Sequence, residues 1–79
     1  MYTYAVCYSW FQFHTVGGNN YQLSRMDNII IKLSNKIDNE KTYWELVQQC
    51  RKDFIANHQS KIFNTEFCAV VSFTELCHD

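Results

Sequence analysis

Cysteine and histidine are the residue types in this chain that could do chemistry, because they supply metal ligands and nucleophiles. The seven of them are Cys7, Cys50, Cys68, Cys77, His14, His58 and His78. Zinc sites are usually built from pairs such as C-x-x-C or H-x₃₋₅-H, which bring two ligands onto one ion. The sequence has neither pair, and the adjacent Cys77 and His78 would point to opposite faces of a strand. The spacing therefore predicts no metal site.

Nucleophilic catalysis needs a thiol or hydroxyl held beside a histidine and an orienting acid. Here the histidines fall in predicted loops or at predicted ends of elements, whereas the cysteines fall mainly in apolar patterns. The Gly17-Gly18 pair matches neither G-x-G-x-x-G nor G-x-x-x-x-G-K, the glycine-rich patterns that cradle phosphates. We therefore expect a protein that is not an enzyme and that uses no cofactor.

The cellular context sets the expected state of the thiols. The N-terminus lacks the pattern of a secretory signal, and no apolar run is long enough to span a membrane. Disulfides are rare in the cytosol, and free cysteine packs as a small hydrophobe. We expect a cytoplasmic protein with no membrane association and with reduced, mostly buried cysteines.

Composition predicts one small folded domain, residues 1–79. Hydrophobic residues make up 47% of the chain and aromatic residues 16%, which predicts a real core rather than disorder. Seven Lys and Arg against eight Asp and Glu give a formal net charge of −1. This balance argues against a general nucleic-acid binder, whose affinity depends on an excess of basic residues.

Two terminal segments, Tyr2–Phe13 and Glu66–Leu76, are predicted to be strands that are apolar on both faces. In the first, alternation places Tyr2, Tyr4, Val6, Tyr8 and Trp10 on one side and Ala5, Cys7, Phe11 and Phe13 on the other. In the second, Phe67, Ala69, Val71 and Phe73 alternate with Cys68, Val70 and Ser72. A sheet with such strands needs cover on both faces, and a chain of 79 residues has little to spare for it.

The middle of the chain holds a turn and an ambiguous segment. Thr15–Asn20 contains the only two glycines of the chain and is predicted to reverse its direction. Apolar spacing over Tyr21–Ile37 would suit a helix, but its β-branched triplet favours a strand over Met26–Leu33. Tyr21–Arg25 would then be a loop or a long hairpin arm.

One helix is clearly predicted after this segment. Thr42-Tyr43-Trp44-Glu45 matches a capping box at its start, and Asn57–Ser60 ends it. Its apolar face consists of Tyr43, Leu46, Val47, Cys50 and Phe54. The sequence predicts an α+β fold with a three-stranded antiparallel or mixed sheet in the order 2-1-3 and this helix packed on one face.

The uncovered face of the sheet is the predicted functional surface. Tyrosine and tryptophan are enriched at binding hot spots, so the expected partner is another protein, with a second copy of the chain as one possibility. The candidate contact residues are Tyr4, Tyr8, Trp10, Gly17, Gly18, Asn19, Asn20, Tyr21 and Arg25.

Two alternatives remain open for this face. The same aromatics could stack single-stranded nucleic acid, with Arg25, Lys32 and Lys36 near the phosphates. The chain could instead cover the face itself, and the residues that could do so are Tyr21, Leu23, Trp44 and Phe63.

The chain resembles small phage-encoded or mobile-element proteins of strand–strand–helix–strand type. The resembling segments are Tyr2–Ser9, Gly17-Gly18-Asn19, Asn28–Ile31 and Val70–Leu76, and the chain departs from the group in its longer Tyr21–Asp27 segment. The resemblance implies an inhibitor of host defence, of the anti-CRISPR kind, that binds a target protein. A phage-encoded protein of this kind would act in the host cytoplasm. It is a likeness of size and element order, and it identifies no target.

Overall fold

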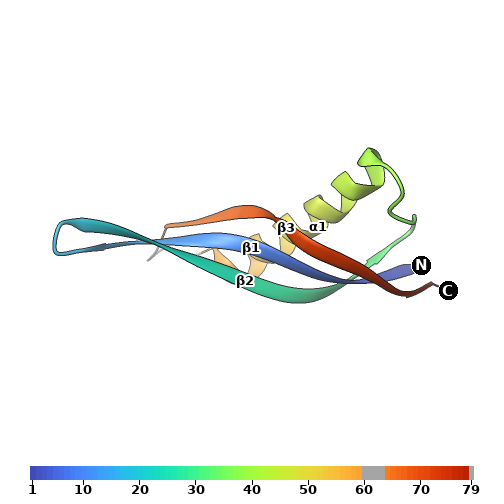
Figure 1. Cartoon of the computed structure of the whole chain (residues 1–79), viewed down its shortest axis with the longest axis horizontal. Coiled ribbons are helices and arrows are strands. Elements are labelled where there is room, and N and C mark those ends of the chain that lie inside the picture. Colours follow the sequence, from blue (N-terminus) through green and yellow to red (C-terminus); the bar gives the residue numbers. More distant parts are fainter. Residues whose placement is uncertain (60–63, 79) are drawn as a thin grey trace.

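The computed structural model describes residues 1–59 and 64–78 of the chain. Three strands and one helix follow one another as β1 (Tyr2–Val16), β2 (Asn19–Leu33), α1 (Glu40–His58) and β3 (Asn64–His78). The strands form an antiparallel sheet in the order β2-β1-β3 (Figure 1). The predicted α+β fold, the strand order and the central place of the first strand are confirmed.

The hairpin of β1 and β2 is longer than predicted. Gly17 and Gly18 adopt φ values of +59° and +82°, and a two-residue turn with positive φ at both positions matches the twist of antiparallel strands. The register then runs without a break from Val16 opposite Asn19 to Tyr2 opposite Leu33. Tyr21–Arg25 therefore belongs to β2. Of the two possibilities predicted for this segment, a loop or part of a long hairpin, the structure shows the second.

The pairing of β1 with β3 is less regular. The register shifts between Thr3 and Tyr4, between Cys7 and Tyr8, and between Ser9 and Trp10. Each shift leaves one extra residue in β3, and these residues are Leu76, Val71 and Cys68. Such bulges bend and twist a strand locally.

The N-cap of α1 lies three residues before the predicted one. Asn39 is the N-cap, and its side-chain oxygen accepts a hydrogen bond of 2.9 Å from the backbone N–H of Thr42. The Thr42 hydroxyl accepts in return from the backbone N–H of Asn39, at 3.2 Å. The prediction that Thr42 caps the helix with Glu45 is wrong, because Asn39 is a good N-cap residue and makes Thr42 its N3 partner.

Replacing Asn39 by alanine should lower the free energy of unfolding by about 0.5–2 kcal/mol, since a donor of the first helical turn loses its acceptor. The measurement is urea denaturation followed by circular dichroism. Asn35→Ala, an exposed asparagine of the preceding bend, is the matched control and should change stability by less than about 0.5 kcal/mol. Equal effects of the two changes would contradict this assignment of the cap.

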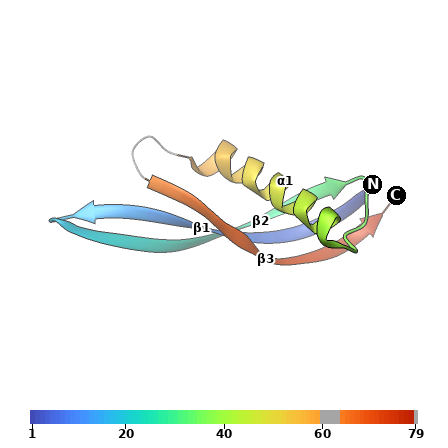
Figure 2. The same cartoon turned by 90° about the horizontal axis from the view of Figure 1, so that it is seen from above.

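The core lies between α1 and one face of the sheet (Figure 2). The sheet contributes Tyr4, Val6, Tyr8, Trp10, Ile31 and Leu33, and the helix contributes Leu46, Cys50 and Phe54. The helix thus covers one face only, as predicted. Because β1 and β2 extend beyond both α1 and β3, the molecule is elongated, with extents of 52 × 19 × 19 Å.

Candidate functional site

The tyrosine and tryptophan face of β1 is the buried face. Tyr4, Tyr8 and Trp10 retain 2%, 0% and 8% of their exposure, so the expectation that they form an open contact surface is wrong. The helix packs here because this side carries the largest side chains, whose burial contributes most to stability. The opposite side of β1 offers smaller residues over the same length, Ala5, Cys7 and Ser9.

Among the described residues, α1 is the main cover of this face, and Ile37 of the segment before it packs beside the helix. Tyr21, Leu23 and Trp44, which were the alternative cover, are all exposed. Phe63, the fourth of them, lies outside the described residues. The aromatic platform proposed for single-stranded nucleic acid is therefore inaccessible, because bases cannot stack on rings that already contact the helix.

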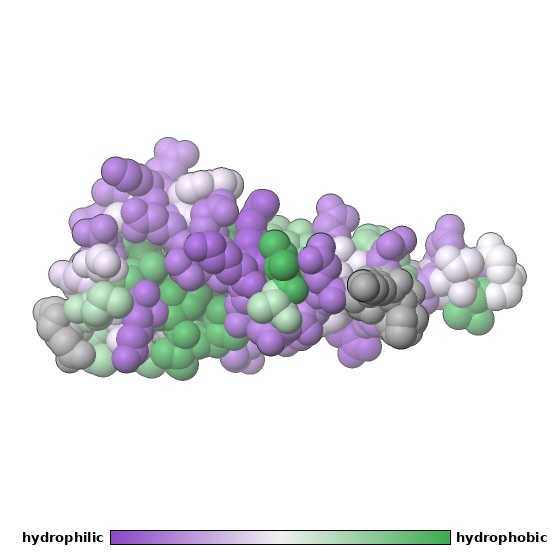
Figure 3. All heavy atoms as spheres, turned by 180° about the vertical axis from the view of Figure 1, so that it is seen from behind, coloured by the Kyte–Doolittle hydropathy of each residue, from purple (hydrophilic) through white to green (hydrophobic). Residues whose placement is uncertain are grey.

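The other predicted contact residues lie on or near a projecting arm. Pairing of β3 with β1 ends at Phe13, so residues 14–21 form a two-stranded extension, which we call the hairpin arm. It is the narrow end of the molecule in Figure 3. Gly17, Gly18, Asn19, Asn20 and Tyr21 are exposed on it, and Arg25 is exposed further along β2. The structure therefore separates these residues from Tyr4, Tyr8 and Trp10.

The side of the sheet turned away from α1 is uncovered, and we call it the open face. Its central row comes from β1: Thr3, Ala5, Cys7, Ser9, Phe11 and Phe13, all of them half-buried. Across the strands, Ile30 pairs with Ala5 and Met26 pairs with Ser9. Both are exposed large hydrophobic residues. One face of the sheet is thus accessible, as the sequence predicted. It is the Ala5 and Cys7 side of β1, however, and not the predicted tyrosine and tryptophan side.

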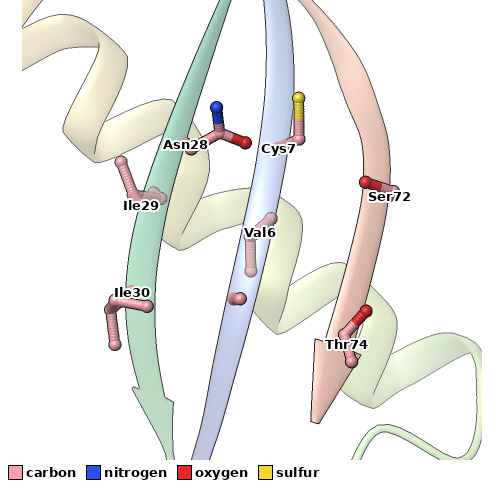
Figure 4. A pocket seen from close by; sticks show the side chains of 8 residues that line it. Val6, Cys7, Asn28, Ile29, Ile30, Ser72 and Thr74 are labelled. Carbon is pink, nitrogen blue, oxygen red and sulfur yellow. The ribbon is translucent and has the colours of Figure 1, made fainter. Parts of the chain in front are cut away.

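A shallow hollow of about 290 Å³ lies on the open face. Figure 4 looks onto it, with α1 behind the strands. Ala5 is one of its lining residues. Figure 4 shows the other side chains of the open face that line it, which are Cys7, Asn28, Ile30, Ser72 and Thr74. The hollow is the size of one or two protruding side chains, with both apolar and hydrogen-bonding groups around it.

The open face is almost free of charge. Among the residues that pair across this face in β1, β2 and β3, the charged ones are Lys32 and Glu66, of opposite sign and on different edges. A surface that binds phosphates requires several basic side chains. Aromatic and aliphatic residues with few charges are instead characteristic of the centre of protein–protein interfaces.

A polar cluster beneath the helix was not predicted from the sequence. The hydroxyl of Tyr8 donates to Oδ2 of Asp53 at 2.7 Å and lies 3.3 Å from Oδ2 of Asp27. Nε2 of His58 contacts the same oxygen of Asp27, and the His58 ring stacks on Trp10 with centroids 4.4 Å apart. The cluster joins β1, β2 and α1. The available signal was Tyr8 itself, because a buried tyrosine hydroxyl needs a partner.

The surroundings of the Tyr8 hydroxyl in this cluster favour its protonated form. Burial, together with hydrogen bonding to Asp53 and the charge of both aspartates, raises the pKa of Tyr8 far above its usual value. Burial and the nearby Asp53 likewise raise the pKa of Cys50 to about 11. Both groups therefore stay protonated near neutral pH, and the Cys50 thiol is a poor nucleophile there.

The cysteines are free thiols, but only one is buried. Cys50 is in the core, Cys7 is half-buried, and Cys68 and Cys77 are exposed. The expectation of mostly buried thiols is wrong because β3 is an edge strand, with Cys68 at a bulge and Cys77 opposite Thr3 on the open face. In the described part of the chain, no group of three or more His, Cys, Asp or Glu side chains could hold a metal ion.

Comparison of the chain with protein-family models, with curated proteins and with solved structures found no match. Within residues 1–59 and 64–78, no helix combines the length and the apolar character needed to cross a bilayer.

Proposed function

We propose that this protein is a non-enzymatic module that binds another protein through the open face of its sheet. The observation that carries the proposal is a set of apolar residues on the open face, half-buried Phe11 and Phe13 on β1 and exposed Met26 and Ile30 on β2, in a surface with two charges of opposite sign. The expected partner surface is itself largely uncharged, with a protruding apolar side chain that fits the hollow beside Ile30. The resemblance to small phage proteins supports a target in host defence.

The support for a protein partner rather than nucleic acid comes from the same residues. Tyr4, Tyr8 and Trp10, the aromatics predicted to stack bases, are in the core, and Lys32 is the basic residue among those paired across the open face. A bound oligonucleotide would therefore have few cations to replace its counterions. An uncharged protein surface carries no such requirement.

Two exposed isoleucines give a matched test. Ile30 lies on the open face and is 61% exposed, whereas Ile55 lies on the outer side of α1 and is 54% exposed. We expect Ile30→Glu to reduce the protein captured from nuclease-treated host lysate at least about tenfold, since a carboxylate would be buried without a partner. Ile55→Glu should leave capture unchanged.

The two variants must first show the same thermal unfolding, so that capture reports the surface rather than the fold. Loss of capture in both variants, or only in Ile55→Glu, would place the binding surface elsewhere. A partner that survives Ile30→Glu but disappears with nuclease treatment would contradict the proposal in favour of nucleic acid.

A further inference from the structure

The two edges of the sheet differ in a way that points to one of them as a binding edge. β3 is interrupted by three register shifts, which disrupt its ladder and discourage further pairing. β2 pairs with β1 over all of its 15 residues without a shift, and the chain contains no proline. Its outer edge is thus a long, regular row of backbone donors and acceptors, of the kind that accepts an added strand.

Alternation fixes which residues of β2 present their backbone to that edge. The turn at Gly17-Gly18 closes on the pair Val16 and Asn19, which in a two-residue hairpin is a hydrogen-bonded pair. The odd-numbered residues of β2 therefore bond to β1, and the even-numbered residues face outward. An added antiparallel strand must bond through the even-numbered residues.

We infer that β2 pairs with β2 of a second copy, antiparallel and over its whole length. Full overlap of Asn19–Leu33 with itself places the two-fold axis at Met26, an even-numbered residue that bonds outward. The side-chain faces also match, so both helices lie on the same side of a joined sheet. A two-fold axis makes the contact self-complementary and closed.

Charge supports this register over its neighbours. With the axis at Met26, Arg25 of each copy lies opposite Asp27 of the other, in a pair without backbone bonds, where side chains are closest. Shifting the axis to Arg25 sets two arginines opposite each other, and shifting it to Asp27 sets two aspartates opposite each other. Within one copy, Asp27 uses Oδ2 for Tyr8 and His58, which leaves Oδ1 as an acceptor.

In the same register, exposed apolar residues of β2 in one copy would pack against β2 of the other copy. Leu23 and Tyr21 are 42% and 52% exposed, and they would lie opposite Ile29 and Ile31 of the second copy. A groove of about 350 Å³ already runs there, between the edge of β2 at Ile29–Lys32 and the helix residues Gln49, Lys52 and Asp53. The hairpin arm of each copy would thus extend along the body of the other.

The first test is the oligomeric state of the purified chain by sedimentation equilibrium. We expect a dimer whose dissociation constant rises at least about tenfold in Arg25→Asp, which sets like charges opposite each other twice. Lys36→Asp makes the same charge change outside β2 and should leave the constant unaltered. A monomer at 100 μM (about the concentration of a routine sample), or equal effects of both variants, would overturn the inference.

A thiol on the axis tests the register without changing charge. In a Cys68→Ser, Cys77→Ser background, Met26→Cys places two thiols in a hydrogen-bonded pair, where Cα atoms are about 5.5 Å apart and a disulfide fits. Oxidation should give a covalent dimer. Ser24→Cys, also exposed in β2, would lie opposite Asn28 and should remain monomeric on a denaturing gel. Cross-linking through position 24 and not through position 26 would overturn the register.

Discussion

Replacing Leu46 by alanine is expected to lower the free energy of unfolding by about 2–5 kcal/mol, the largest effect of any single change proposed for this chain. Leu46 is fully buried at the centre of α1, against the aromatic side of the sheet. Its truncation removes apolar contacts and leaves a cavity between α1 and the sheet. The free energy of unfolding of a small domain is only about 5–15 kcal/mol in total, so this variant should be partly unfolded at 37 °C.

The measurement is urea denaturation at 25 °C, with Ile55→Ala as the control on the same helix. Ile55 is exposed, so its truncation should cost less than about 0.5–1 kcal/mol. A small effect of Leu46→Ala would mean that α1 is only loosely packed on the sheet and would undermine the assignment of the core.

The second largest effect is expected for Tyr8→Phe, which removes one hydroxyl from the polar cluster. Hydrogen bonds to charged groups contribute about 1.5–3 kcal/mol, and the bond from Tyr8 to Asp53 is short, at 2.7 Å. We expect a loss of stability in that range at pH 7. Tyr21→Phe makes the same chemical change on an exposed ring and should be neutral.

The pH dependence gives Tyr8→Phe a second readout. Because folding raises the pKa of Tyr8 and brings that of Cys50 to about 11, the folded state keeps protons that the unfolded chain releases. The stabilisation is fully present below the pKa of the unfolded groups. The Cys50 contribution is lost as pH rises from about 8.5 toward 11, and the Tyr8 contribution begins to be lost above about 10. Under reducing conditions, wild-type stability should fall between pH 8 and pH 10.5.

The fall with pH should be smaller in Tyr8→Phe than in the wild type, and Tyr21→Phe should match the wild type. Parallel curves for wild type and Tyr8→Phe would show that the Tyr8 hydroxyl is not held by the aspartates, whatever the loss at neutral pH.

Much of the fold followed from patterns that are local in the chain. Alternation identified the first and last strands, the two adjacent glycines located the hairpin turn, and the spacing from Leu46 to Phe54 identified the helix. The rule of short, right-handed connections then gave the strand order. The element ends were less predictable, because pairing with a neighbour extended β2 through Tyr21–Arg25, where the local pattern is weak.

The choice of covered face could not be made from alternation alone. Both sides of β1 are apolar, and the helix selects between them through the summed size of the side chains that it meets, which is a property of three elements at once. The polar cluster was missed for the same reason, since Asp27, Asp53 and His58 come together only after folding. The cap was missed because Asn39 and Thr42 both suit the position.

The irregular pairing of β3 has a consequence for how far association can proceed. An edge that resists strand addition acts as a terminator, whereas a sheet with two regular edges can polymerise without limit. If β2 of one copy pairs with β2 of another, the outer edges of the joined sheet, over the described residues, are the two irregular β3 strands. Addition of strands to the sheet then ends at two molecules. Although the strands expose β-branched residues such as Val16, Ile30 and Val71, the dimer offers no regular edge from which a fibril could grow.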